Sequence, residues 1–105
     1  MAGKATLYIT PREGQPGHYL VVVDGTGFHS SDGKTVGARI RGDDKWFDDT
    51  LFGLGPTRIL GGIFNMSATV PANTLNEDWG EDEIYASVKI AGSSEIRTNT
   101  IRRSF

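Results

Sequence analysis

Four aspartates around one tryptophan are the clearest candidates for chemistry in this sequence. Asp43, Asp44, Asp48 and Asp49 flank Trp46 within seven residues. Carboxylate oxygens are ligands that Ca²⁺ prefers, so the four side chains would form a calcium site if the two turns that carry them meet. Their spacing does not match an EF-hand loop, and aspartate is also a preferred turn residue for backbone reasons alone. Two interpretations therefore stand, a calcium site and a set of solvated turn residues.

Trp46 and Trp79 are the candidates for contact with a sugar ring or a partner protein. Trp46 precedes Phe47, and Trp79 lies in a second acidic segment, from Glu77 to Glu83. An exposed indole offers a large apolar face with a polar edge, which suits both kinds of ligand. The alternative is that Trp46 or Phe47 packs in the core and that the second acidic segment is a solvated loop.

Catalytic constellations are missing from the sequence pattern. His18 and His29 are the only histidines, and neither belongs to a Glu-x-x-His motif. The chain has no cysteine, which excludes a thiol nucleophile and a cysteine-ligated zinc site. Gly25-Thr26-Gly27 lacks the Lys-Ser/Thr of a phosphate-binding loop. We expect a protein that is not an enzyme, with no catalytic residue and no cofactor apart from the calcium considered above.

Two short motifs have a known chemistry. Arg41-Gly42-Asp43 is an RGD tripeptide, and we expect it in a hairpin turn, where exposure would suit adhesive recognition. Asn65-Met66-Ser67 has the form of an N-glycosylation sequon, with Asn65 on the polar face of a strand. Both tripeptides also occur by chance in β proteins, so neither assigns a function.

Length and charge limit the partners. The chain of 105 residues is the size of one domain, and its net charge of −2 gives no basic field. We therefore expect no nucleic-acid partner. The longest uninterrupted apolar run is 20–23, which is too short for a bilayer span, so we expect no direct membrane insertion.

Alternating polar and apolar residues indicate the elements that must position these side chains. Period-two alternation recurs along the chain, and glycine and proline interrupt every longer helical pattern. The pattern predicts an all-β fold, a two-sheet sandwich of seven to eight strands, with a small barrel as the alternative. Strands are expected at 6–10, 18–24, 35–41, 45–47, 63–70, 83–90 and 95–104, and at most one short strand, near 57–60, in the segment 51–60.

The inward-facing positions of these strands predict the core. Strand 63–70 alternates most clearly, with Phe64 as its largest apolar residue, whereas Tyr85, Ser87 and Lys89 are expected to be exposed. The predicted core consists of Leu7, Ile9, Val21, Val23, Phe28, Val36, Phe64, Met66, Ala68, Val70, Ile84, Ala86 and Val88.

Three segments combine turn glycines and prolines with alternating strands in a fixed order. The turn Gly14-Gln15-Pro16-Gly17 precedes a strand that ends in Gly25-Thr26-Gly27-Phe28. Gly62-Ile63-Phe64 opens a strand that ends in Val70-Pro71-Ala72, and Thr98-Asn99-Thr100-Ile101 follows near the end. Together they resemble an immunoglobulin-like domain of the IPT/TIG type found in prokaryotic cell-surface proteins. The extra hairpin in 39–60 departs from that pattern, as do the arginines at 97, 102 and 103.

The resemblance implies a function class and a location. Residues 1–105 would be a single immunoglobulin-like module of a longer, multi-domain chain. It would act as a non-catalytic structural, adhesion or protein-contact unit, extracellular or at the cell surface. Its partners would be other domains of the same chain or other surface proteins. The alternative is a carbohydrate-binding or calcium-dependent accessory module of a polysaccharide-acting enzyme, which predicts an exposed Trp46 or Trp79 and convergent aspartates.

Overall fold

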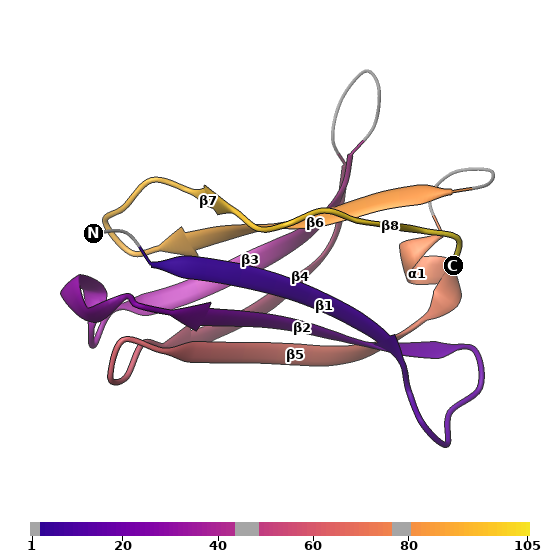
Figure 1. Cartoon of the computed structure of the whole chain (residues 1–105), viewed down its shortest axis with the longest axis horizontal. Helices are drawn as coiled ribbons and strands as arrows, with labels where there is room; N and C mark the ends of the chain where they lie inside the picture. The colour runs from indigo at the N-terminus through magenta and orange to yellow at the C-terminus, as the bar shows by residue number, and fades with distance from the viewer. Residues whose placement is uncertain (1–2, 44–48, 77–80) are drawn as a thin grey trace.

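The computed structural model describes residues 3–43, 49–76 and 81–105, which form two antiparallel sheets (Figure 1). One sheet contains β1 (Lys4–Pro11), β2 (His18–Thr26) and β5 (Phe64–Pro71). The other contains β3 (Thr35–Gly42), β4 (Asp49–Arg58), β6 (Asp82–Ile90), β7 (Ile96–Arg97) and β8 (Ile101–Arg103). The 3₁₀ turn η1 (His29–Ser31) follows β2, and the single helical turn α1 (Ala72–Leu75) follows β5.

The strand order confirms the predicted fold class. The first sheet has the order β1-β2-β5, and the second has the order β4-β3-β6-β7, with β8 also paired to β6. Figure 1 shows the two sheets lying against each other as layers. Two packed antiparallel sheets of three and five strands form a β-sandwich of eight strands. No helix in the described ranges is long and apolar enough to cross a bilayer.

Strand β2 is the central strand of the three-stranded sheet. It pairs with β1 on one side and β5 on the other, so Val23 lies between Leu7 and Met66. Val21 and Val23 are fully buried between the sheets. Because side chains alternate along a strand, Leu20 and Val22 point to the outer face, where they are half-buried.

The predicted core is confirmed with two adjustments. Eleven of the thirteen predicted residues are buried, whereas Ala68 and Val70, toward the end of β5, are only partly buried. The prediction left out further core residues, some within strands that it had defined and others, such as Leu54 and Leu75, in elements that the pattern did not define. These are Ala5, Ala38, Ile40, Leu54, Ile59, Leu75 and Ile90.

Phe64 and Gly25 are fitted to each other. The two residues are cross-strand partners between β5 and β2, and the Phe64 ring also packs on Phe28 at a centroid distance of 5.4 Å. A Cβ on Gly25 would lie 2.0 Å from the Phe64 ring. Packing therefore requires glycine at position 25, whereas Gly27 has a φ of 76°, which favours glycine for its backbone conformation.

The prediction of at most one short strand in 51–60 is wrong. Strand β4 runs over ten residues and pairs with β3 along its whole length. Two irregularities accommodate the residues that break the pattern. At the first irregularity, one residue of β3, Gly37, lies opposite two residues of β4. It falls between the paired residues Val36–Thr57 and Ala38–Leu54. Leu51 is the extra residue at the second irregularity. Such β-bulges allow a strand to continue past glycine and proline.

The single strand predicted at 95–104 is two strands. Thr98, Asn99 and Thr100 separate β7 from β8, and both short strands pair with β6. The prediction that Tyr85 and Ser87 are exposed is also wrong, since both are buried. The short strand predicted at 45–47 lies outside the described residues.

Candidate functional site

The predicted calcium ligands and aromatic contacts are only partly within the described residues. Asp44, Trp46, Asp48 and Trp79 lie in the segments 44–48 and 77–80, which the structure does not describe. Asp49 opens β4 and is exposed. Asp43 accepts a hydrogen bond from a terminal guanidinium nitrogen of Arg97 at 2.8 Å, so this carboxylate already has a cationic partner.

Within residues 3–43, 49–76 and 81–105, no three His, Asp or Glu side chains are grouped so that they could hold a metal ion. The calcium site therefore stays a prediction. Phe52, the third aromatic residue of the hairpin, is half-buried and packs on the core.

The RGD tripeptide lies at the end of β3, and the turn predicted after it falls mostly in 44–48, outside the described residues. Arg41 and Gly42 are the last residues of β3, and Gly42 is buried. Gly42 pairs with Asp49 and Ile84 on either side, because β3 is an inner strand of its sheet. The first two residues of the tripeptide thus belong to the sheet, whereas Asp43 follows the end of β3. Asn65 is exposed on β5, as predicted for the sequon, and its amide donates a hydrogen bond to the Asp24 carboxylate.

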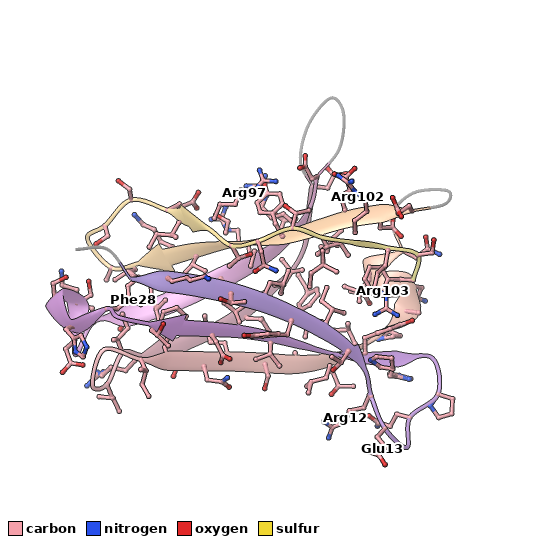
Figure 2. All side chains as sticks on the ribbon, viewed as in Figure 1. Arg12, Glu13, Phe28, Arg97, Arg102 and Arg103 are labelled. Carbon is pink, nitrogen blue, oxygen red and sulfur yellow. The ribbon has the colours of Figure 1, made fainter. Side chains whose placement is uncertain are left out.

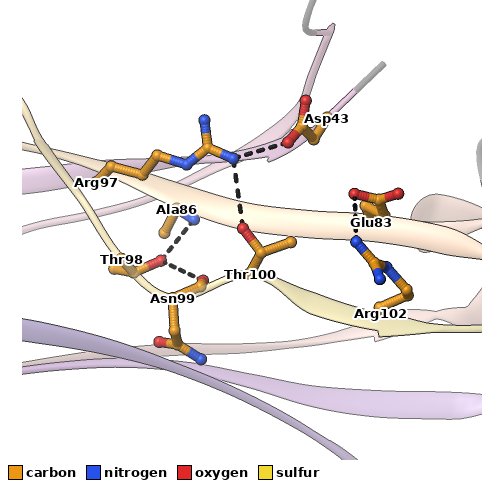
Figure 3. Close-up of polar contacts among 8 residues, drawn as sticks. All are labelled: Asp43, Glu83, Ala86, Arg97, Thr98, Asn99, Thr100 and Arg102. Carbon is orange, nitrogen blue, oxygen red and sulfur yellow. Dashed lines mark hydrogen bonds and ion pairs between the residues drawn. The ribbon is translucent and has the colours of Figure 1, made fainter. Parts of the chain in front are cut away.

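Arg97 connects three strands on the outer face of the five-stranded sheet (Figures 2 and 3). Its guanidinium carbon lies 3.7 Å from the centroid of the Tyr85 ring. The same group bonds Asp43 and, at 3.3 Å, the Thr100 hydroxyl. This cover explains why Tyr85 is buried although it points away from the core.

Two short polar clusters hold the β7–β8 segment. Thr98 exchanges two hydrogen bonds with Ala86. Its amide donates to the Ala86 carbonyl at 2.9 Å, and its hydroxyl accepts from the Ala86 amide at 2.8 Å, the bond that Figure 3 shows. Arg102 pairs with Glu83 on β6 at 3.2 Å. The first cluster is buried and the second exposed, so the Thr98 contacts contribute more of the stability.

Asn99 links the two sheets. Its side-chain oxygen accepts a hydrogen bond from the Leu7 amide at 2.8 Å, and its side-chain nitrogen donates to the Leu7 carbonyl at 3.2 Å. The amide thus takes the place of a neighbouring strand along the free edge of β1. Thr98 and Asn99 together position β7 and Arg97 beside β6.

A groove lies farther along the same outer face, over β3, β4 and β6. We call it the glycine groove, because Gly37, Gly53 and Gly55 form its floor with Pro56 and Ser87. Arg39, Lys89 and Glu95 stand at its rim, and its volume is 430 Å³. The cross-strand register explains the floor: Arg39 lies between Gly53 and Ser87, and Gly37 lies opposite Lys89.

Two of the three floor glycines are not required by the fold. Gly55 is required, because its φ is 87° and a Cβ would lie 2.7 Å from the Met66 sulfur. Gly37 and Gly53 have no positive φ, and a Cβ on them would meet its nearest atom at 3.6 Å and 3.7 Å, which is ordinary contact. Glycine in a strand weakens it and often marks a close approach of a ligand or another backbone. These two positions therefore leave the sheet bare where a side chain would fit.

The charges at the rim are unequal. The Lys89 ammonium bonds the Ser93 carbonyl. Arg39 is exposed and, within the described part of the chain, makes no hydrogen bond or ion pair. Glu95 is the one acidic residue among those that line the groove. The rim thus carries one more cation than anions, and the Arg39 guanidinium has its donors available.

Comparisons with known proteins give no relative: no family model matches the chain, and neither a curated protein nor a solved structure does so. The resemblance to IPT/TIG-type domains stays a prediction from the motifs. The sequence analysis missed the glycine groove, because each glycine alone indicates only a turn or a break. The one available signal in the sequence was that Gly37 and Gly53 lie on the two sides of a short acidic hairpin, where they could come close to each other.

Proposed function

We propose that this domain is a non-catalytic protein-contact module of a cell-surface or secreted protein, and that the glycine groove is its contact surface. The observation that carries the proposal is the pair Gly37 and Gly53. Glycine at each of these positions makes its strand less stable than a residue with a side chain would. Neither glycine is required by backbone conformation or packing. A partner that lies on the bare floor explains both residues.

The position of the histidines supports a role other than catalysis. His18 opens β2 and His29 follows the end of that strand, so about 25–30 Å of extended chain separates them. The His18 ring bonds the Pro16 carbonyl, and His29 lies beside Gly62. The two imidazoles therefore cannot act on one substrate atom.

The shape of the groove favours an extended protein segment. Glycine Cα atoms and the Pro56 ring offer a low apolar floor, on which another backbone can lie closely. Among the lining residues, Arg39 on β3 and Lys89 on β6 supply donors for carboxylates. Strand β4 is the edge strand of its sheet, so the groove opens sideways as well as outward. An extended segment with acidic side chains is the partner that this chemistry fits.

A titration followed by two-dimensional ¹⁵N NMR tests the proposal. The probe is a peptide that alternates glutamate and threonine, with a glutamine–threonine peptide as the uncharged control. We expect the acidic peptide to shift the amides of Gly37, Arg39, Gly53 and Ser87, and rising salt to weaken the effect. The glutamine peptide should shift the same amides less.

Charge reversal at the rim makes the test specific. Arg39→Glu should weaken binding of the acidic peptide about tenfold or more. Arg12→Glu changes the net charge by the same amount as Arg39→Glu. Arg12 lies on the β1–β2 loop, far from Arg97 and the outer face of β6 (Figure 2). This control variant should therefore leave binding unchanged. No shift in the groove, or an equal loss in both variants, would argue against the proposal.

A further inference from the structure

A second groove lies on the outer face of the three-stranded sheet. We call it the tyrosine groove; its volume is 480 Å³, and it is lined by Lys4, Thr6, Tyr8, Asp24, Ile63 and Asn65, among others. Its strands are β1, β2 and β5, so it lies on the opposite layer from the glycine groove. The contact function proposed above leaves it without a role.

A row of polar side chains crosses its floor. Thr6, Asp24 and Asn65 are direct cross-strand partners, one from each strand of the sheet. Neighbouring strands are about 4.8 Å apart, so the three side chains stand close together. The Asn65 amide nitrogen donates to one Asp24 oxygen, which orients both groups. The row still offers a hydroxyl, a second amide hydrogen and carboxylate and amide oxygens to a ligand.

Apolar side chains stand on both sides of this row. Tyr8 lies two residues beyond Thr6 on the same face, about 7 Å away along the strand, and is 49% exposed. On the other side Ile63 is 57% exposed. Within the described residues, the Tyr8 hydroxyl makes no hydrogen bond. An exposed aromatic ring with a free polar tip is the kind of side chain that packs on a ligand with one apolar and one polar side.

From this arrangement we infer that the tyrosine groove binds a neutral sugar residue of a glycan or polysaccharide. A pyranose ring has apolar C–H faces and a rim of hydroxyl groups, each of which donates and accepts. The Tyr8 ring and Ile63 match the apolar faces, and the Thr6–Asp24–Asn65 row matches the hydroxyls. Lys4 balances the charge of Asp24, so the groove does not favour an anionic sugar.

The test uses the complete chain and soluble hexasaccharides as probes: cellohexaose, chitohexaose and mannohexaose, with an oligogalacturonate as the anionic probe. We expect at least one neutral probe to shift the ¹⁵N amides of Thr6, Tyr8, Asp24 and Asn65 at millimolar concentration. The amides of Gly37 and Gly53 should stay unchanged, which separates this site from the glycine groove.

Variants on the same sheet make the inference falsifiable. Tyr8→Ala should weaken the binding about tenfold or more, and Tyr8→Phe should retain most of it. Asp24→Ala should also weaken binding, whereas Thr69→Ala, which removes an exposed side chain outside the groove, should not. The dispersion of each spectrum reports whether the variant is folded. The inference is overturned if no neutral probe shifts the groove amides, if only the anionic probe does so, or if Tyr8→Ala binds like the unmodified protein.

Discussion

Arg97 lies over the ring of Tyr85, with its guanidinium carbon 3.7 Å from the ring centroid. The same guanidinium donates to Asp43 at 2.8 Å. Tyr85 belongs to β6 and Asp43 follows β3, so one side chain joins β7 to two other strands. These contacts add to the Thr98 and Asn99 hydrogen bonds that position β7, a short strand with only two paired residues.

Removal of this guanidinium should destabilise the domain measurably. Arg97→Ala should lower the free energy of unfolding by about 1–2 kcal/mol, since it loses a cation–π contact and an ion pair. Urea denaturation measures this change, and Arg12→Ala on the β1–β2 loop is the control with little expected effect. A double-mutant cycle with Tyr85→Leu should give a coupling of about 0.5–1 kcal/mol. A coupling near zero would mean that the stacked geometry contributes nothing.

Asn99 should be as important as a core residue although its side chain is an amide. Asn99→Ala leaves the Leu7 amide and carbonyl without their partners, and should cost about 1–3 kcal/mol of unfolding free energy. Hydrogen exchange at the Leu7 amide should become faster in this variant. Asn73→Ala, at an exposed position in α1, provides the matched control. Unchanged exchange at Leu7 would contradict the inter-sheet link.

Phe64 and Gly25 should behave as one packing unit. Phe64→Ala should cost about 3–5 kcal/mol, because it removes a buried ring from the core. Gly25→Ala alone should cost about 1–3 kcal/mol, since its methyl group would enter the space of the Phe64 ring. The unfolding free energy lost in the double variant Gly25→Ala/Phe64→Leu should be smaller than the sum of the losses in Gly25→Ala alone and Phe64→Leu alone, as measured by chemical denaturation. Additive costs would show that the two residues do not share this space.

Gly55 provides the contrast to the bare positions of the groove floor. Gly55→Ala places a methyl group against the Met66 sulfur and forces alanine to a φ of 87°. We expect a loss of about 1–3 kcal/mol in the free energy of unfolding. A thermal or urea unfolding curve equal to that of the unmodified protein would show that this glycine, too, is unnecessary for the fold.

Most strands could be predicted from local alternation, because their inward residues face a core that lies directly between the two sheets. Strands β2, β3, β5 and β6 follow the predicted bounds within two residues at each end. Strand β4 could not be predicted, since its bulges are stabilised by pairing with β3 and not by its own sequence. The break between β7 and β8 depends in the same way on partners in β6 and β1.

The functional surfaces were less predictable than the fold. The burial of Tyr85 arises from Arg97, twelve residues later in the chain, so alternation within β6 alone gives the wrong result. The glycine groove combines Gly37 of β3 with Gly53 of β4, which pairs with Arg39, and Gly37 itself lies at a register shift between the two strands. The polar row of the tyrosine groove likewise combines three strands that are distant in sequence.

The variant Gly37→Thr tests the central claim, that the bare floor of the glycine groove serves a partner and not the fold. Two quantities are measured on the same protein: the free energy of unfolding in urea, and the binding of the glutamate–threonine peptide by ¹⁵N NMR. We predict that stability is retained or rises by about 0.5–1 kcal/mol, because threonine suits a strand better than glycine, while peptide binding is lost. A loss of stability comparable to that of Gly55→Ala, or peptide binding that is unchanged in a stable variant, would contradict the account.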